Sequence, residues 1–262
     1  MTALPIKKDE TNNVITLSVV DGKLSKKPEV RYNKDGSIDK RYNSKVAGVS
    51  SEVYPLVSQE EIKAVVDVLN RQIENATTDN KRHLACRNKM MFLVGINLGI
   101  RASDLCSLKY SFFMNQDGTF KDFYKLKPKK TKKTGKYVTL YFNQTVKKSI
   151  TDYVKEYPIE DIDGYIFKSQ KGNAPINEKS LWQIIVNIVA EAGIERNVGS
   201  HTLRKTFGYH VWHGSEDKEK ALVMLMTIFN HNSIATTKKY IGIMGEEIED
   251  VFNGLNLGLD FV

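Results

Sequence analysis

Apolar side chains recur at helical spacing from residue 58 onward. Ser58 and Glu61 have the spacing of a capping box, and the apolar positions that follow lie three or four residues apart: Ile62, Val65, Val66, Leu69 and Ile73. We expect a helix to begin here and the compact domain to begin near residue 55. After a polar break at residues 75–81, residues 83–99 predict an apolar helix that ends in a Gly-rich turn before Arg101. Residues 104–108 predict the next short helix.

Between about residues 120 and 142 the pattern changes from helical to alternating. Residues 123–124 and 137–142 flank a Lys-rich stretch, which predicts a β-hairpin with a cationic tip. Helical spacing returns after the predicted N-cap Asn177, and Gly193 ends the segment, whose apolar face is formed by Leu181, Ile184, Ile185, Ile188, Val189 and Ala192. Helices with one small antiparallel sheet predict an α+β domain that is mainly helical.

The two ends of the chain have a different character. Residues 1–54 scatter lysines and arginines among turn formers, with a predicted strand at residues 14–20 and turn signals at Asp21-Gly22 and Asp35-Gly36. This segment is too short for a core of its own, so it is either a solvated tail or a basic arm that orders along DNA phosphates. Residues 246–262 form a C-terminal segment whose apolar positions need a surface to cover.

Composition narrows the class of protein. The 262 residues can bury a core without disulfides or metals, and they carry a formal net charge of +8 with a pI near 9.2. This charge attracts polyanions such as nucleic acid, although charge alone leaves the partner open. Cys86 and Cys106 are isolated, which argues against a zinc site or a disulfide framework and favours a reducing cytoplasm. The apolar runs fall short of the about 20 residues that span a bilayer, and no signal peptide is evident, so we expect a cytoplasmic protein.

Three separated clusters hold cationic and proton-transferring residues. Residues 99–105 contain Arg101 with Asp104, a pair that can equally be a local ion pair. Residues 200–207 place His201 and Arg204 three apart, on one face of a helix, where both could reach one anionic group; the alternative is a partly buried histidine with a surface arginine. In residues 229–241, polar turn residues separate two helices, and the second presents Tyr240 nine positions after His231. A lone tyrosine there could also be a packing residue.

Taken together, the clusters resemble the tyrosine recombinase, or phage integrase, family in order and separation, over about residues 55–245. The resemblance implies that family's catalytic-domain fold and a site-specific recombinase that cleaves and rejoins double-stranded DNA without a metal or other cofactor. By this resemblance Tyr240 attacks phosphorus and leaves a 3′-phosphotyrosine, which conserves the bond energy for resealing.

The resemblance also assigns roles to the other residues. Arg101 and Arg204 would hold the phosphate oxygens in place of a metal ion. His201 would accept a proton or orient the nucleophile, and His231 would hydrogen-bond a non-bridging oxygen; either could titrate near neutrality. The family's general acid is a hairpin lysine, for which Lys133 is favoured and Lys130 is the rival. The further lysines expected to contact DNA are Lys125, Lys127, Lys129, Lys130, Lys132, Lys136 and Lys205. The alternative for those of the hairpin is a solvated cationic loop.

The sequence departs from the family at its N-terminus. Many relatives carry a helical core-binding domain before the catalytic domain, and residues 1–54 have no room for one. Either the basic arm does part of that work, a partner protein supplies it, or the chain no longer recombines. The expected partners are DNA, a homotetramer on DNA and an accessory DNA-bending protein, with nucleoid association when bound. Residues 246–262 would dock on a neighbouring protomer or on their own domain. A non-cutting repressor and, more remotely, a type IB topoisomerase are the alternative functions.

Overall fold

The structure, a computed structural model, describes residues 52–129, 137–170, 172–243 and 252–254, with the backbone of residues 17–20 and 23–26. The chain forms two compact units, residues 1–52 and 53–262. In the first unit, strands β1 (Leu17–Val20) and β2 (Lys23–Lys26) pair antiparallel, so the described strand begins three residues after the predicted one. The predicted turns at Asp21-Gly22 and Asp35-Gly36 lie outside the described residues. The role of residues 1–54 as a DNA-binding arm stays a prediction.

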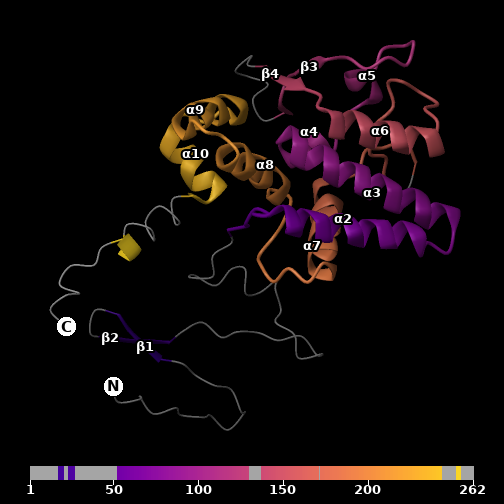
Figure 1. Ribbon diagram of the computed structural model, residues 1–262. Coiled ribbons are helices and arrows are strands. Elements are labelled where there is room, and N and C mark those ends of the chain that lie inside the picture. Colours follow the sequence, from indigo (N-terminus) through magenta and orange to yellow (C-terminus); the bar gives the residue numbers. More distant parts are fainter. Residues whose placement is uncertain are drawn as a thin grey trace, which may run out of the picture. The chain divides into compact units, whose positions relative to one another are not determined.

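The second unit is built around helix α3 (Figure 1). α3 (Asp79–Leu98) packs against α2 (Gln59–Glu74), α6 (Gln144–Glu156) and α8 (Thr202–His213). Helix α7 (Glu178–Glu191) packs against α2. Short helices α4 (Ala102–Leu105) and α5 (Tyr110–Phe113) follow α3, and α9 (Lys218–Phe229) and α10 (Ile234–Ile241) follow α8. With the β3–β4 hairpin, this arrangement confirms the predicted α+β, mainly helical class.

Side-chain caps determine where the helices begin. The Ser58 hydroxyl accepts the backbone N–H of Glu61 at 3.1 Å, as the predicted capping box requires, whereas the Glu61 carboxylate accepts from Val57 instead of Ser58. Helix α3 begins at residue 79, four residues before the predicted start, because the Thr78 hydroxyl caps its first turn. The predicted polar break is therefore partly the exposed first turn of this helix. Helix α4 likewise begins at residue 102 and not at 104.

Strands β3 (Phe123–Leu126) and β4 (Val138–Tyr141) form the predicted antiparallel hairpin. Phe123 lies opposite Tyr141, and Leu126 lies opposite Val138. Side chains alternate between the two faces of such a pair, and Leu126 and Leu140 are buried on the inner face. The hairpin is thus attached to the domain by one face, while its other face points to solvent.

The buried apolar residues form two clusters. The larger one fills the space between α2, α3, α6 and α7, and its fully buried members include Phe92, Phe113 and Phe167. The smaller cluster holds α8, α9 and α10 together and consists of Tyr209, Leu222, Leu225, Phe229, Ile241 and Ile243. The last three helices therefore have a core of their own. Within the described residues, no helix is both long and apolar enough to cross a membrane.

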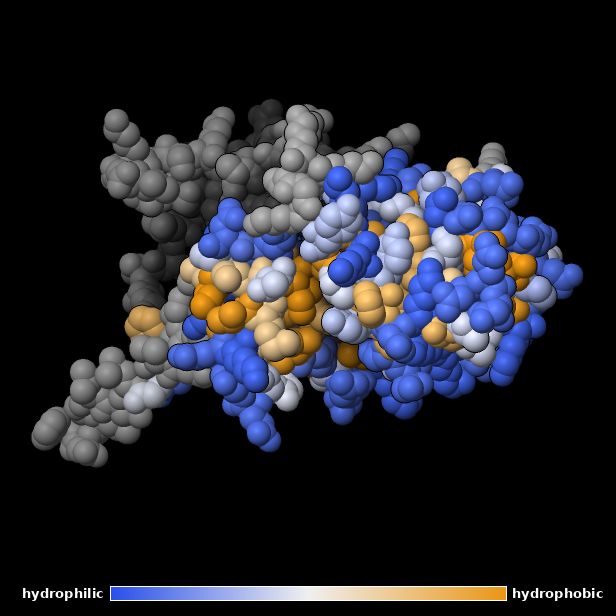
Figure 2. Space-filling view, turned by 90° about the horizontal axis from the view of Figure 1, so that it is seen from above, coloured by the Kyte–Doolittle hydropathy of each residue, from blue (hydrophilic) through white to orange (hydrophobic). Residues whose placement is uncertain are grey.

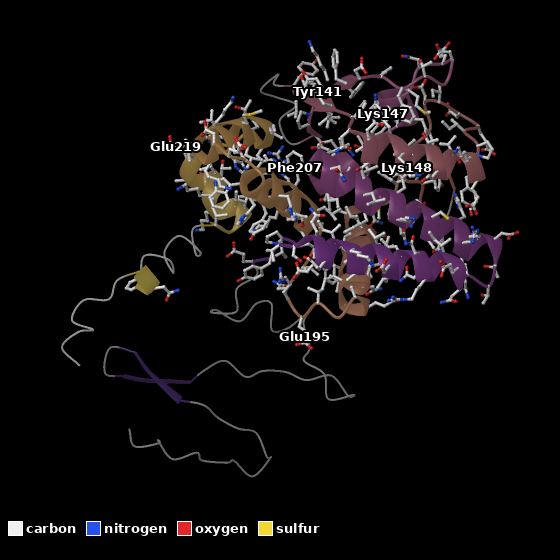
Figure 3. All side chains as sticks on the ribbon, in the orientation of Figure 1. Tyr141, Lys147, Lys148, Glu195, Phe207 and Glu219 are labelled. Atoms are coloured by element: carbon white, nitrogen blue, oxygen red, sulfur yellow. The ribbon has the colours of Figure 1, made fainter. Side chains whose placement is uncertain are left out.

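Gly99 is required at the end of α3. It caps the helix in the left-handed region at φ 59°, and a Cβ there would lie 2.3 Å from the Phe207 ring. Figure 3 shows Phe207 between α8 and the end of α3. Only glycine combines this backbone conformation with so close an approach. The contact therefore sets how closely α8 approaches the turn before Arg101.

We expect Gly99→Ala to lower the free energy of unfolding by about 2–5 kcal/mol. The left-handed conformation costs an alanine about 1–2 kcal/mol, and overpacking against Phe207 adds about 1–3 kcal/mol. Gly118→Ala is the matched control, because Gly118 has φ 82° and a Cβ added there would meet nothing within 4 Å, so only the backbone cost applies. Urea denaturation measures both variants. Equal losses in the two would show that the Phe207 contact contributes nothing.

Candidate active site

Tyr240 lies one residue before the end of α10. The Ser233 hydroxyl caps the helix by accepting the backbone N–H of Thr236 at 3.1 Å, and Gly242, at φ 90°, ends it. The next residue after the tyrosine, Ile241, is fully buried in the smaller core cluster. Because Ile241 anchors the helix, the partly buried Tyr240 ring is held against α8 and the end of α9.

The carbonyl oxygen of Phe229 brings two arginines together. Asn230 ends α9 in the left-handed conformation at φ 52°, an end for which asparagine is suited. The freed Phe229 oxygen accepts from Arg204 Nη2 at 2.9 Å and from Arg101 Nη2 at 3.4 Å. Two arginines that lie 25 and 128 positions from Phe229 in sequence thus converge on one atom.

Arg204 is buried without a carboxylate partner among the described residues. Its side chain is 4% exposed, donates to the Gly99 oxygen at 2.8 Å and lies 4.2 Å from the centroid of the Phe229 ring. Burial lowers the pKa of Arg204 to about 10, with the Tyr240 phenol and Asp104 opposing the shift. The guanidinium therefore keeps its charge at neutral pH. The alternative of a surface arginine is wrong.

Arg101 is half-buried at the N-cap of α4. The predicted alternative of an ion pair with Asp104 is not formed in the described part of the chain. Asp104, 2% exposed, instead accepts the backbone N–H of Lys129 at 2.9 Å, three residues after the end of β3. Asp104 thus connects the helix that Arg101 begins to the hairpin. The sequence analysis did not predict this role of Asp104. The signal that could have indicated it is an acidic residue between apolar positions of a short helix.

The phenol of Tyr240 is hydrogen-bonded to His201. Their Oη and Nδ1 atoms are 3.0 Å apart, and His201 is exposed at the N-cap of α8. Burial raises the pKa of Tyr240, whereas the charge and hydrogen bond of Arg204, and then the charge of Arg101, lower it. A base within hydrogen-bond reach of a nucleophile is the geometry that proton removal requires.

His231 lies on the other side of the phenol ring, at 5.2 Å between ring centroids, and its Nδ1 is 3.1 Å from Thr237 Oγ1. Burial, then Arg204 and Arg101, lower the pKa of His231 to about 4. The expectation that His231 could titrate near neutrality is therefore wrong. The imidazole is neutral at pH 7, and the fully buried Thr237 hydroxyl orients it.

The structure thus brings five of the six predicted site residues together: Arg101, His201, Arg204, His231 and Tyr240. The sixth, Lys133, lies outside the described residues, as do Lys130, Lys132 and Lys136. Lys125, Lys127 and Lys129 are exposed on the hairpin.

Lys205 differs from these surface lysines. It is 5% exposed, and its Nζ lies 5.5 Å from the centroid of the Tyr240 ring. This position places a buried ammonium group beside the Tyr240 ring. Among the described residues, no three His, Cys, Asp or Glu side chains gather as metal ligands.

Comparison with known proteins identifies the family. The sequence model of the phage integrase family matches residues 57–245, and the chain belongs to this family. The probable integrase/recombinase YoeC of Bacillus subtilis is 34% identical over 62% of this chain and 83% of its own length. Tyrosine recombinase XerC of Halalkalibacterium halodurans is 22% identical over 74% of this chain and 59% of its own.

A solved structure shares the fold. The XerH site-specific recombinase, in a post-cleavage complex with its palindromic difH substrate, superimposes with a TM-score of 0.54 at 18% identity. The match covers 85% of this chain and 60% of that chain. This chain therefore spans about three fifths of XerC and XerH. The predicted tyrosine recombinase catalytic-domain fold is confirmed.

We expect the low pKa of His231 to reduce stability in acid. Between pH 6.5, its ordinary pKa, and about 4, the unfolded chain binds a proton at this residue that the folded chain does not. The free energy of unfolding therefore falls as pH falls through this window. His231→Gln removes this contribution, so its urea midpoint should fall less steeply than that of the wild type between pH 6.5 and 4.

Met224→Gln, at an exposed position on α9, is the control and should keep the wild-type slope, because it removes no titratable group. If the urea midpoint of His231→Gln fell with pH as steeply as that of the wild type, the pKa of His231 would not be lowered in the folded chain.

Proposed function

We propose that the chain is a site-specific DNA recombinase that cleaves and rejoins double-stranded DNA through a 3′-phosphotyrosine intermediate. The observation that carries this proposal is the Tyr240 hydroxyl, which is bonded to a histidine and lies beside two arginines that share one carbonyl acceptor. A phenol, a base and paired guanidiniums around one space are what phosphoryl transfer from DNA needs.

In the proposed reaction, the Tyr240 oxygen attacks phosphorus while His201 accepts the phenol proton. Arg101 and Arg204 donate to the non-bridging oxygens and stabilise their charge. Neutral His231, in the tautomer whose Nδ1 accepts from the Thr237 hydroxyl, donates one further hydrogen bond from Nε2. The bond from phosphorus to the 5′ oxygen breaks as the bond to Tyr240 forms. Attack by a 5′ hydroxyl reverses these steps and releases the tyrosine.

The departing 5′ oxygen needs a proton. We assign its donor to the loop that joins β3 to β4, with Lys133 favoured over Lys130. Support comes from the attachment of the hairpin beside Arg101 through the Asp104 to Lys129 hydrogen bond. An ammonium that protonates the leaving group supplies general acid catalysis without a metal ion.

The proposed partners are double-stranded DNA, three further copies of the chain and an accessory DNA-bending protein, with nucleoid association when bound. The XerH complex with difH supports DNA as the partner. In this proposal residues 1–54 are a basic arm, residues 55–245 the catalytic domain and residues 246–262 a C-terminal segment. The net charge of +8 supports attraction to DNA phosphates.

Tyr240→Phe tests the chemistry. Wild type incubated with nicked suicide duplexes from the ends of its own mobile element should form a covalent protein–DNA adduct, because the released strand cannot religate. The variant lacks the nucleophilic oxygen, so adduct formation should fall by more than about a thousandfold, with binding unchanged. Denaturing electrophoresis measures the adduct, and gel shift measures binding.

Tyr209→Phe, at another tyrosine of the same core cluster, is the matched control and should form adduct. Tight binding by wild type without any adduct would favour the repressor. Relaxation of any supercoiled plasmid without strand exchange would favour the topoisomerase.

Salt dependence tests the proposed lysine contacts. Lys125→Gln should reduce the slope of log binding constant against log salt by about 0.9, the value for one lost phosphate contact. Lys63→Gln is the control, because Lys63 pairs with Asp67 on α2, and its slope should equal the wild-type value. An unchanged slope for Lys125→Gln would remove this residue from the interface.

Lys205→Gln tests the buried lysine beside Tyr240. An unchanged salt slope of binding, together with slower adduct formation, would show that the Lys205 ammonium acts on Tyr240 and not on a phosphate.

A further inference from the structure

The solvent-facing side of the β3–β4 hairpin carries aromatic and cationic residues together. Side chains alternate across a strand, and the odd-numbered positions of both strands and their immediate extensions are exposed or partly exposed. We call this set the hairpin outer face; it consists of Phe123, Lys125, Lys127, Lys129, Tyr137, Thr139 and Tyr141. Figure 2, seen from the side on which the hairpin lies in Figure 1, shows hydrophobic residues interspersed among hydrophilic ones.

The rings of this face are unusually accessible. Phe123 is 48% exposed, Tyr137 60% and Tyr141 72%. Phe123 and Tyr141 form a cross-strand pair with centroids 5.9 Å apart, and Figure 3 shows Tyr141 at the outer edge of the hairpin. Lys127 Nζ lies 5.9 Å from the centroid of the Tyr137 ring. Exposed aromatic rings gathered on one face are typical of an interaction site.

The lysines between the rings indicate nucleic acid as the partner. Lysine is depleted in the cores of protein–protein interfaces, because its ammonium is costly to desolvate. Single-stranded nucleic acid, in contrast, stacks its bases on aromatic rings and places its phosphates against lysines. Lys125 lies two residues along β3 from Phe123, on the same face, so a ring and a charge follow one another there. This is the pattern that a base-bearing strand requires.

Unpaired bases fit this face better than an intact duplex. In a duplex, each base face is covered by its neighbours, so an aromatic ring can stack only where the strand has left its complement. The proposed reaction creates such a strand, because cleavage releases a 5′-hydroxyl end that must unpair before it can join another duplex. The face begins next to the site, since the backbone N–H of Lys129 donates to Asp104, in the helix that Arg101 begins.

We propose that the hairpin outer face binds the released 5′-hydroxyl strand during exchange, with bases stacked on Phe123, Tyr137 and Tyr141 and phosphates at the lysines. This inference rests on the proposed function. The four residues of β3 span about 14 Å at about 3.4 Å per residue. At about 3.4 Å per stacked nucleotide, this strand alone accommodates about four nucleotides.

Binding to three labelled duplexes tests the stacking separately from cleavage. One is blunt, one carries a 5′ tail of six thymidines, and one carries a tail of six abasic residues with the same phosphates. By fluorescence anisotropy, the full chain should bind the thymidine tail about tenfold more tightly than the abasic tail, because stacking favours the bases. The double variant Phe123→Thr, Tyr141→Thr should lose this preference and bind the blunt duplex as wild type does, since threonine suits a strand.

Met224→Ser removes an exposed apolar side chain, 54% exposed on α9, and should keep the preference. Lys125→Gln should weaken binding to both tails equally. Equal binding of the two tails by wild type, or a preference that survives in the double variant, would overturn the inference. A changed sedimentation coefficient of the free double variant, together with an unchanged tail preference, would also overturn the inference. The face would then contact another copy of the chain and not DNA.

A cleavage assay separates this inference from the proposed function. The double variant should form the Tyr240 adduct at the wild-type rate but join it to a second duplex about tenfold more slowly, because the incoming strand loses its stacking contacts. Wild type that forms no adduct would overturn the proposed function, and with it the assignment of this strand to cleavage. Wild type that forms adduct and a double variant that exchanges strands equally fast would overturn only the inference.

Discussion

The carbonyl oxygen of Phe229 is the atom on which the site depends. A helix end leaves carbonyls without intrahelical partners, and the left-handed Asn230 turns this one toward two guanidiniums. The same residue's ring lies under Arg204 and beside Tyr240, at centroid distances of 4.2 and 5.5 Å. One residue at the end of α9 therefore positions both arginines and contacts the tyrosine.

Hydrogen bonds to neutral carbonyls leave the arginine charges available. A buried guanidinium is costly unless it is bonded, and the usual solution is a carboxylate, which cancels the charge. Arg204 instead donates to the oxygens of Gly99 and Phe229. The resulting positive field affects its neighbours, because Arg204 and Arg101 both lower the pKa of His231 and of Tyr240. Positive charge that no carboxylate among the described residues neutralises is suited to an anion that arrives from outside.

Local patterns made most of the fold predictable. The main helices show a helical period and an N-cap residue in the sequence, and the hairpin shows alternation of apolar and polar residues. The hairpin and the cap at Asn177 are examples. The start of α3 was less predictable, because the Thr78 cap favours a helix that the polar residues after it do not suggest. The order of the three clusters indicated the site residues. Their contacts with one another, the burial of Arg204 and the role of Asp104 depend on packing between distant helices, which no local pattern encodes.

Asp104 extends the argument from the arginines to the hairpin. A buried carboxylate that accepts a backbone N–H fixes a segment more rigidly than a surface contact does, because breaking the bond leaves a charge desolvated. The bond from the backbone N–H of Lys129 therefore restrains residue 129 relative to the helix that Arg101 begins. Residues that stabilise charge on the phosphate and residues that act on the leaving oxygen must be held together within ångströms. The structure connects the helix that Arg101 begins to the hairpin through the backbone N–H of Lys129, and the Lys129 side chain stays exposed.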